Sequence, residues 1–337
     1  MLRFFATRLG GGLVSIFGAS LLAFLFLRKM PGDPAQLVLG PLASDDAIAA
    51  LRDQMGLNDP IWVQYWHYVR DFFTGDWGFS YSTGQDVSTQ ISTRLPASIE
   101  LGLWAFGFAF VAAVVLALAS TYRRRPVVDG ITRAAAFVGL GTPPFWLALM
   151  LLVIFFSWLG WFPGPEGRIS DDIPLPPKIT GMITVDALLT LNLRAFGDAF
   201  MHIVLPAIAL GLAAFALLVR LLRANLLEVG REPFLVVSRS KGLSRWTAYA
   251  RHALPNAFLP TLTAGGLLLA QMIGGSVLVE KVYNWPGVGS LVVDSILRQD
   301  FSVVQAFILL SACVYVMVNL LVDVLYGVLD PRVRSAR

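Results

Sequence analysis

The most informative residue types and spacings lie in a short basic stretch between two long apolar segments. This stretch, residues 232–244, has the sequence EPFLVVSRSKGLS. Pro233 suits the first position of a helix, and the carboxylate of Glu232 favours the positive end of the helix dipole. Gly242 can adopt the left-handed conformation that ends a helix. The pattern therefore predicts a short helix from about Pro233 to Lys241.

The chemistry of such a helix is partner binding rather than covalent catalysis. It has one apolar face with cations around it, formed by Phe234, Val237 and Leu243 and by Arg239, Lys241 and Arg245. A helix of this kind fits the groove of a partner protein. The alternative is a solvated basic loop between two membrane spans.

Signatures of catalysis are missing from the sequence. There is no G-x-x-x-x-G-K-[ST] loop to hold nucleotide phosphates, no H-E-x-x-H pair and no G-x-S-x-G elbow. The three histidines fall in separate regions, and Cys313 is the only cysteine. The chain is therefore not expected to be an enzyme, to bind a metal or to bind a cofactor.

The composition predicts an all-α polytopic membrane protein. Hydrophobic residues make up 56% of the 337 residues and charged residues only 14%. A bilayer core needs about 20 apolar residues per helix, and the backbone there satisfies its hydrogen bonds internally. Six uncharged runs meet this length and predict six transmembrane helices: Leu9–Leu27, Leu101–Tyr122, Ala134–Pro165, Ala199–Val219, Ala253–Val279 and Phe301–Val322.

The charge distribution predicts the orientation of these spans. With six spans both termini lie on one side, and that side carries 16 basic residues against four acidic ones. The opposite side carries ten basic and 17 acidic residues. The positive-inside rule places both termini in the cytoplasm. Because topology explains the net charge of +4, nucleic acid is not expected as a partner.

The same boundaries divide the chain into three parts. Residues 1–29 form the first transmembrane helix, residues 30–97 an extracytoplasmic insertion, and residues 98–337 a five-helix core with a cytoplasmic loop at 228–255. In the insertion, helices are expected from Ser44 to about Met55 and over Pro60–Phe73. The second helix is rich in aromatic residues, which favours a position at the membrane interface, with a docking surface for an external partner as the alternative.

Several local signals predict breaks and turns. Thr142-Pro143-Pro144 should kink the third span or mark its start. Arg94-Leu95-Pro96 is typical of the start of the second span. The segment Gly160–Ala199 predicts an external loop with a short helix near Val185–Leu191, and Trp285-Pro286-Gly287 predicts a turn before the sixth span.

Polar residues inside the spans are candidates for a translocation path. Asp323 is the one acidic residue within a predicted span, and such residues are functional candidates by default. Gln271 and Asn319 are further polar positions in the fifth and sixth spans. Hydrogen bonding between helices explains these two equally well.

The cytoplasmic loop resembles the E-A-A loop of permease subunits in bacterial ATP-binding-cassette (ABC) importers. That loop has the pattern E-A-A-x-x-x-G followed by I-x-L-P. Gly242 and Leu254-Pro255 match in register, whereas Val236-Val237-Ser238 and His252 replace the E-A-A and Ile positions. The longer peptide-importer form matches better, at Glu232, Phe234, Ser238 to Ser244, Arg251 to Leu254, Asn256, Ala257 and Pro260.

The resemblance extends over nearly the whole chain, to the first permease subunit of dipeptide and oligopeptide importers. The matching motifs are Pro31-Gly32-Asp33-Pro34, Met55 to Pro60, Gly75-Asp76-Trp77-Gly78, Arg94-Leu95-Pro96-Ala97, Trp285-Pro286-Gly287, Gln299-Asp300 and Leu329 to Val333. It implies a type I ABC importer permease fold in the bacterial cytoplasmic membrane. The positions it assigns to ATPase coupling are Glu232, Phe234, Val237, Ser238, Arg239, Lys241, Gly242 and Leu243.

The resemblance also implies a set of partners. A second permease subunit would share the translocation path for di- or oligopeptides, and two cytoplasmic ATPase subunits would use ATP and magnesium. An extracytoplasmic peptide-binding protein would deliver the cargo, and membrane lipid would surround the spans. The alternatives are the same architecture carrying nickel chelates, glutathione or another small solute, and, more distantly, a stand-alone secondary transporter.

Overall fold

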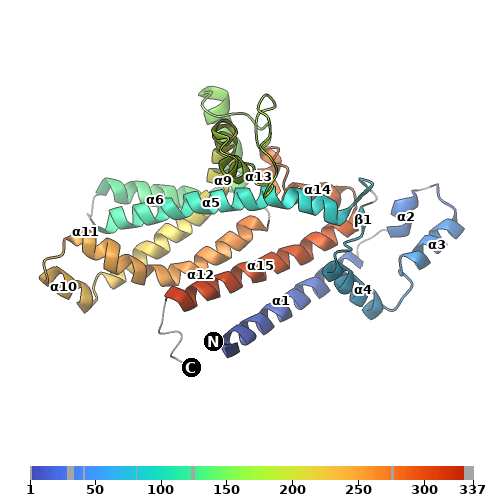
Figure 1. Cartoon of the computed structure of the whole chain (residues 1–337), viewed down its shortest axis with the longest axis horizontal. Helices are drawn as coiled ribbons and strands as arrows, with labels where there is room; N and C mark the ends of the chain where they lie inside the picture. The colour runs from blue at the N-terminus through green and yellow to red at the C-terminus, as the bar shows by residue number, and fades with distance from the viewer. Residues whose placement is uncertain are drawn as a thin grey trace. The chain divides into compact units, whose positions relative to one another are not determined.

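The computed structural model describes residues 2–28, 34–40, 42–80, 82–122, 126–274 and 277–329, and the described chain is mainly helical (Figure 1). Parts of two motifs lie outside these residues: residues 31–33 of Pro31-Gly32-Asp33-Pro34 and the terminal motif from Asp330 onward. The side chain of Arg239 is also outside them, although its backbone belongs to a helix.

The chain forms two compact units. Unit 1 comprises Met1–Leu95 with Val288–Val316, and unit 2 comprises Pro96–Gly287 with Met317–Arg337. Helix α5 (Val87–Tyr122) and helix α15 (Phe301–Leu329) contribute residues to both units. These are units of packing, and the division by membrane topology stays a prediction.

Among the described residues, five helices are long and apolar enough to cross a membrane, or six if one bent pair counts as a single span. The five segments are Leu9–Phe26, Val87–Tyr122, Leu193–Val229, Arg245–Ile273 and Phe301–Leu325. They confirm the all-α polytopic prediction and leave the number of spans at five or six.

The third predicted span is the bent pair. Helix α6 (Pro126–Gly141) is followed by α7 (Pro144–Leu151) and by the π-helix η1 (Leu152–Trp158), and the chain bends by 115° between them. Figure 1 shows the two parts running in different directions. Two consecutive prolines cause the break, because Pro143 and Pro144 lack the backbone N–H groups that a continuous helix needs.

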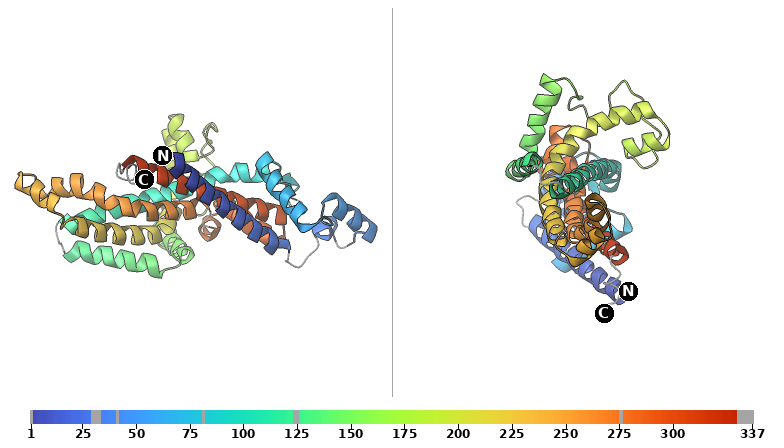
Figure 2. Two further views of the ribbon diagram at one scale, coloured as in Figure 1. Left: turned by 90° about the horizontal axis from the view of Figure 1, so that it is seen from below. Right: turned by 90° about the vertical axis from the view of Figure 1, so that its left-hand side faces the viewer.

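Unit 2 is organised around helix α9 (Leu193–Val229), which packs along α6 and α12 (Leu254–Ile273), as the views in Figure 2 also show. Small residues allow this close packing, as is usual between membrane helices. A side chain on Gly211 would meet the carbonyl oxygen of Ala105 in α5 at 2.6 Å, and one on Gly139 would meet that of Leu212 at the same distance.

Short helices complete unit 2. They are α8 (Ile183–Leu189), α10 (Pro233–Ser240), α11 (Arg245–Thr247), the π-helix η2 (Ala248–Ala253) and α13 (Val277–Val282). The short helix predicted near Val185–Leu191 is confirmed as α8. The fifth apolar run, predicted to reach Val279, is divided between α12 and α13 because the chain leaves the helix after Ile273.

Unit 1 contains the insertion and the helices that support it. Its elements are α1 (Leu2–Arg28), α2 (Pro34–Leu39), α3 (Asp45–Gln54), α4 (Ile61–Thr74), the antiparallel pair β1 (Phe79–Ser80) and β2 (Gln85–Asp86), and α14 (Val288–Leu297). The two helices predicted in the insertion are confirmed. Ser44 caps α3 by accepting a hydrogen bond from the amide of Ala47 at 3.3 Å.

One predicted helix start is wrong. Arg94-Leu95-Pro96 lies within α5, which begins at Val87. Val87 and Ile91 are fully buried against Val288, Leu291 and Val303 in unit 1. This packing extends the helix seven residues beyond the position that the motif indicates, and α5 accommodates Pro96 in its interior.

Candidate functional site

The coupling segment, residues 228–255, connects α9 to α12 and contains α10 (Figure 1). The observed bounds of α10, Pro233–Ser240, agree with the predicted helix. Gly242 has φ +88°, which confirms the left-handed end. Nothing lies within 4 Å of a side chain placed there, so the constraint at Gly242 is conformational rather than steric.

Backbone hydrogen bonds close both ends of this turn. The amide of Lys241 donates to the carbonyl of Val237 at 3.1 Å, and that of Leu243 donates to the carbonyl of Ser238 at 3.3 Å. These bonds satisfy carbonyl groups that the end of a helix otherwise leaves unpaired. Ser244 then caps α11 by accepting a hydrogen bond from the amide of Thr247 at 3.1 Å.

Helix α10 has one anchored position and an exposed apolar surface. Leu235 is 3% exposed and belongs to the core cluster of unit 2. Phe234, Val236 and Val237 are 42%, 61% and 53% exposed. We call these three side chains the apolar patch of α10. A patch of this kind next to an anchored residue is typical of a surface that binds a partner.

Aromatic and cation–π contacts hold the segment that follows α10. The guanidinium of Arg245 lies 6.0 Å from the ring centre of Tyr122 and 5.7 Å from that of Tyr249. The rings of Tyr122 and Trp246 meet edge to face at 5.5 Å. The turn at Gly230 is closely packed against η2, because a side chain at this position would meet the hydroxyl of Tyr249 at 2.7 Å. Helix α11, which follows α10, is therefore attached to α5, and α10 itself packs on η2.

The structure places the predicted coupling residues on one continuous surface segment. Most of them are exposed, and Ser238 is half-buried and donates to the carbonyl of Leu235 at 2.8 Å. The exposed members are Glu232, Phe234, Val237, Lys241, Gly242 and Leu243.

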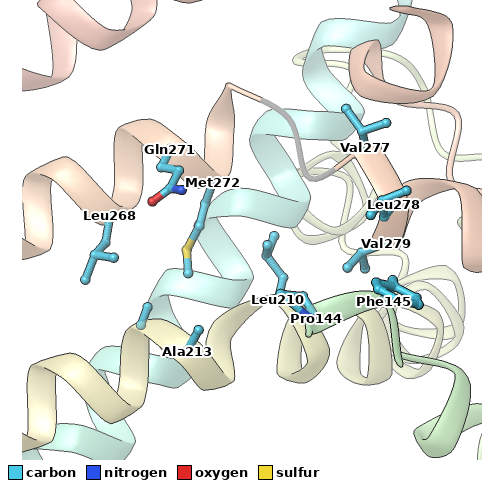
Figure 3. Close-up of a pocket in the computed structure, with 11 residues that line it drawn as sticks. Pro144, Phe145, Leu210, Ala213, Leu268, Gln271, Met272, Val277, Leu278 and Val279 are labelled. Carbon is cyan, nitrogen blue, oxygen red and sulfur yellow. The ribbon is translucent and has the colours of Figure 1, made fainter. Parts of the chain in front are cut away.

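The candidates for a translocation path do not gather at one place. Gln271 lines a cavity of about 280 Å³, shown in Figure 3. Asn319 and Asp323 are half-buried on α15, four residues apart and therefore on one side of that helix, and neither lines the cavity.

The cavity lies where two helices are interrupted. Pro144 and Phe145 come from the start of α7, Met272 from the end of α12 and Val277 from the start of α13, and α9 forms another wall. Of the described residues that line it, Gln271 alone has a polar side chain. Interrupted helices at membrane depth are found where they are buried in protein or line a cavity.

Sequence reasoning missed a buried polar cluster in unit 2, which we call the polar brace: Glu100, Trp104, Arg168, Gly181 and Thr184. Glu100 is 2% exposed and pairs with Arg168. It also accepts hydrogen bonds from the amide and hydroxyl of Thr184, both at 2.6 Å. Trp104 donates to the Thr184 hydroxyl at 3.0 Å, and Arg168 donates to the Gly181 carbonyl at 2.8 Å.

Asp186 extends this region by organising the loop before α8. Its carboxylate accepts hydrogen bonds from the amide and hydroxyl of Thr180, both at 2.7 Å, and from the amides of Gly181 and Ile179 at 2.9 and 3.3 Å. Burial opposes ionisation, but these hydrogen bonds outweigh it and hold the pKa of Asp186 below its ordinary value.

A second buried carboxylate fixes the predicted turn at Trp285–Gly287. Glu280 is 1% exposed and accepts a hydrogen bond from Ser98 at 2.7 Å. Its carboxylate fills the space where a side chain on Gly287 would lie. Trp285 donates to the Ala97 carbonyl at 2.9 Å. The sequence signal for the turn was correct, but nothing local indicated that Glu280 supports it.

These features define a helical membrane protein with an interrupted span, a partly open cavity and an exposed helix between two long apolar helices. Residues 105–335 match the family described as binding-protein-dependent transport system inner membrane component, and residues 1–102 match its N-terminal domain. The chain therefore belongs to this family of inner membrane permease components.

Relatives over the full length have permease names. A probable D,D-dipeptide transport system permease protein of Escherichia coli K12 is 37% identical over 326 residues, covering 97% of this chain and 96% of that protein. A di/tripeptide transport system permease protein of Pseudomonas aeruginosa is 37% identical over 338 residues, with all of both chains covered. A glutathione transport system permease protein of E. coli K12 is 35% identical over 338 residues, covering 99% of each.

Proposed function

We propose that this chain is a permease subunit of an ABC importer for di- or oligopeptides, and that α10 is the helix through which ATPase subunits drive it. The observation that supports coupling most directly is the apolar patch of α10 next to the anchored Leu235. The peptide cargo is supported by the printed names of the dipeptide and di/tripeptide relatives.

The proposed complex divides the work among its subunits. This chain and a second permease enclose the path, two cytoplasmic ATPase subunits bind and hydrolyse ATP with magnesium, and an extracytoplasmic binding protein delivers the peptide. This chain itself binds no cofactor and has no enzymatic activity in this scheme. Closure of the ATPase dimer pulls residues 232–243, and because α10 packs on η2 and the following α11 is attached to α5, the pull reaches the spans. ATP binding thereby biases a two-state equilibrium at a distance.

The proposed path passes the cavity at Gln271. A peptide carries backbone amides along its whole length, and the Gln271 amide both donates and accepts hydrogen bonds. The apolar walls would accept side chains of varied shape without selecting one of them. Asp323 and Asn319, on one side of α15, are further candidates for this path.

The decisive test of coupling uses two matched substitutions in the reconstituted complex. Phe234→Asp puts a charge into the apolar patch, and we expect peptide-stimulated ATP hydrolysis to fall to the unstimulated rate. Leu188→Asp makes the same change at a residue of similar exposure, 47% against 42%, in α8, and stimulation should persist. Stimulation that survives Phe234→Asp and the charge reversal Lys241→Glu would contradict the coupling role.

The cargo requires a separate measurement, because the glutathione relative is about as similar as the peptide relatives. Uptake of labelled dipeptide, glutathione and a nickel chelate should be compared in cells with and without this chain. Loss of dipeptide uptake alone supports the peptide assignment, whereas loss of glutathione or nickel uptake supports the corresponding alternative. Uphill transport by this chain alone in vesicles without ATP would instead favour a secondary transporter.

A further inference from the structure

Helix α4 in unit 1 has three distinct faces. At 3.6 residues per turn, Trp62, Trp66 and Phe73 point within about 40° of one another. They are 72%, 64% and 63% exposed. The face that packs on other elements contains Tyr65, Tyr68 and Phe72, and lies about 100° away. We call Trp62, Trp66 and Phe73 the aromatic stripe.

The third face is polar and lies opposite the aromatic stripe. Gln64, His67 and Asp71 project between about 120° and 180° from the centre of the stripe at ideal helix geometry. The Asp71 side chain is 36% exposed and pairs with Arg70. A helix with an aromatic stripe opposite a polar face has the pattern of a helix lying along a membrane surface.

Contacts with α1 show where α4 lies along this predicted membrane span. The hydroxyl of Tyr65 lies 2.7 Å from that of Ser20 and donates to the carbonyl of Phe17 at 3.3 Å. The ring of Phe24 meets that of Tyr65 at 5.5 Å. Phe17 lies at the middle of the apolar segment Leu9–Phe26, and Ser20 and Phe24 lie in its second half. The contacts of α4 therefore extend from the middle of this apolar segment to Phe24, two residues before its end.

A contact with a second predicted span, α15, gives independent information on the depth of α4 in the membrane. The hydroxyl of Tyr68 donates to the carbonyl of Gln305 at 2.9 Å. Gln305 lies four residues after Phe301, the first residue of α15, which is about 6 Å along the helix at 1.5 Å per residue. Tyr68 thus lies between Phe24, near the end of one apolar helix, and Gln305, near the start of another, which places this part of α4 close to the edge of the hydrocarbon region.

We propose that α4 lies along the membrane interface, with the aromatic stripe inserted among lipid headgroups and upper acyl chains. Tryptophan is favoured at this depth because its ring is apolar and its indole N–H remains polar. Helix α1 also exposes large apolar side chains, among them Leu13, Phe17 and Phe26. In the predicted orientation the leaflet is the extracytoplasmic one.

Spin labels on the two faces of α4 test this directly. In a Cys313→Ala background, which removes the only cysteine, single labels are introduced as Trp62→Cys, Trp66→Cys and His67→Cys. The assembled complex is placed in phosphatidylethanolamine–phosphatidylglycerol nanodiscs, and collision rates with oxygen and with a water-soluble nickel chelate are measured. We expect the oxygen-to-nickel ratio at positions 62 and 66 to exceed that at 67 several-fold.

Two outcomes would overturn the proposal. Equal nickel access at all three positions would place the stripe in water, as expected for a surface that docks a soluble partner. Low access to both reagents at 62 and 66 would mean that protein covers the stripe. If a labelled variant does not assemble, quenching of tryptophan fluorescence by headgroup-proximal brominated lipids replaces the measurement. Trp62→Phe/Trp66→Phe should then lose much of the quenching, and no loss would equally overturn the proposal.

Discussion

The coupling segment and the polar brace, both in unit 2, differ in the residues that they bury and expose. The brace buries the charges of Glu100 and Arg168 and satisfies them with groups of the same chain. The coupling segment leaves apolar side chains exposed and buries Leu235 instead. The Glu100 carboxylate finds its partners within the chain, although Arg168 Nε is buried and has no hydrogen-bond partner in the described structure, whereas the outer surface of α10 stays exposed within this chain.

This difference predicts two separable defects. Damage to the brace should lower the stability of the assembled complex and leave the coupling of each folded complex intact. Damage to α10 should abolish coupling with little loss of stability, because its outer side chains contribute few contacts within the chain. Variants that mix the two effects would show that the regions are not independent.

The largest effect is expected when Glu100 loses its partner. Arg168→Met leaves a carboxylate that is 2% exposed without its cation. Removing one member of a buried ion pair costs about 3–5 kcal/mol. We expect a clear fall in the unfolding temperature of the assembled complex, measured by differential scanning fluorimetry. ATPase stimulation per folded complex should be unchanged.

The exposed pair of Arg194 and Asp172 is the matched control for this prediction. Its charged atoms are 3.8 Å apart and both side chains are 74% exposed. Such pairs contribute little to stability. Arg194→Met should therefore leave the unfolding temperature almost unchanged, and a shift equal to that of Arg168→Met would contradict the role of burial in the brace.

The second largest effect is expected at the end of α10. Gly242→Pro cannot keep φ +88°, because the proline ring fixes φ near −65°. The turn should reorganise and displace Leu243, and peptide-stimulated ATP hydrolysis in the reconstituted complex should be lost. Gly242→Ala should lose only part of it, since the left-handed conformation costs an ordinary residue roughly 1–2 kcal/mol.

Gly40 provides the matched proline control. It also has a positive φ, +82°, with nothing within 4 Å of an added side chain, but it lies in unit 1. Gly40→Pro should keep stimulated hydrolysis in the complexes that assemble. Equal loss in both variants would indicate a general folding defect.

A smaller and pH-dependent effect is expected at Asp186. Because its folded-state pKa is lowered, ionised Asp186 stabilises the loop at a pH above the ordinary aspartate pKa of about 3.9. That contribution disappears as the pH falls through the folded-state value. Asp186→Asn should increase amide hydrogen exchange at residues 179–181. The difference from wild type should stay constant from about pH 7 to 5 and shrink below about pH 4.

If the difference in hydrogen exchange between Asp186→Asn and wild type grew at low pH, the pH dependence would be opposite to the prediction. The ionised carboxylate would then be excluded as the cause of the difference. Asp172→Asn is a suitable comparison, because Asp172 is exposed in the same region and pairs only loosely with Arg194. We expect no change in exchange at residues 179–181 in that variant at any pH.

The contrast between these regions also explains what could be predicted from the sequence. Helix α10 was predictable because Pro233 and Gly242 mark its ends through local backbone preferences. The brace was not, because Glu100 and Arg168 are 68 residues apart and no local pattern connects them. Glu100 was instead treated as the polar boundary of an apolar run starting at Leu101.

Packing over long distances explains the other differences. The wrong start of α5 came from the Arg94-Leu95-Pro96 motif, whose local preference is overridden by the burial of Val87 and Ile91. Gln271 was named from its polarity within a span, but the cavity beside it depends on how α7, α9, α12 and α13 meet. Such placement is a property of the folded chain and not of any single segment.

The smallest expected effect concerns the proposed path and separates Gln271 from Asp323. Gln271→Leu keeps a similar volume and removes the one polar side chain that the described lining of the cavity contains. A peptide in transit would lose about one hydrogen bond, worth roughly 0.5–1.5 kcal/mol, so uptake of labelled dipeptide should fall only several-fold. Basal ATP hydrolysis and the amount of assembled complex should not change.

Asp323→Asn tests the other candidate under the same conditions. If Asp323 faces the path, uptake falls without any loss of assembled protein, although Asp323 does not line the cavity at Gln271. A decrease for Gln271→Leu alone would assign the path to the interrupted helices. A decrease for Asp323→Asn alone would assign it to α15, where Asn319 shares that side of the helix, and unchanged uptake in both variants would remove both residues from the path.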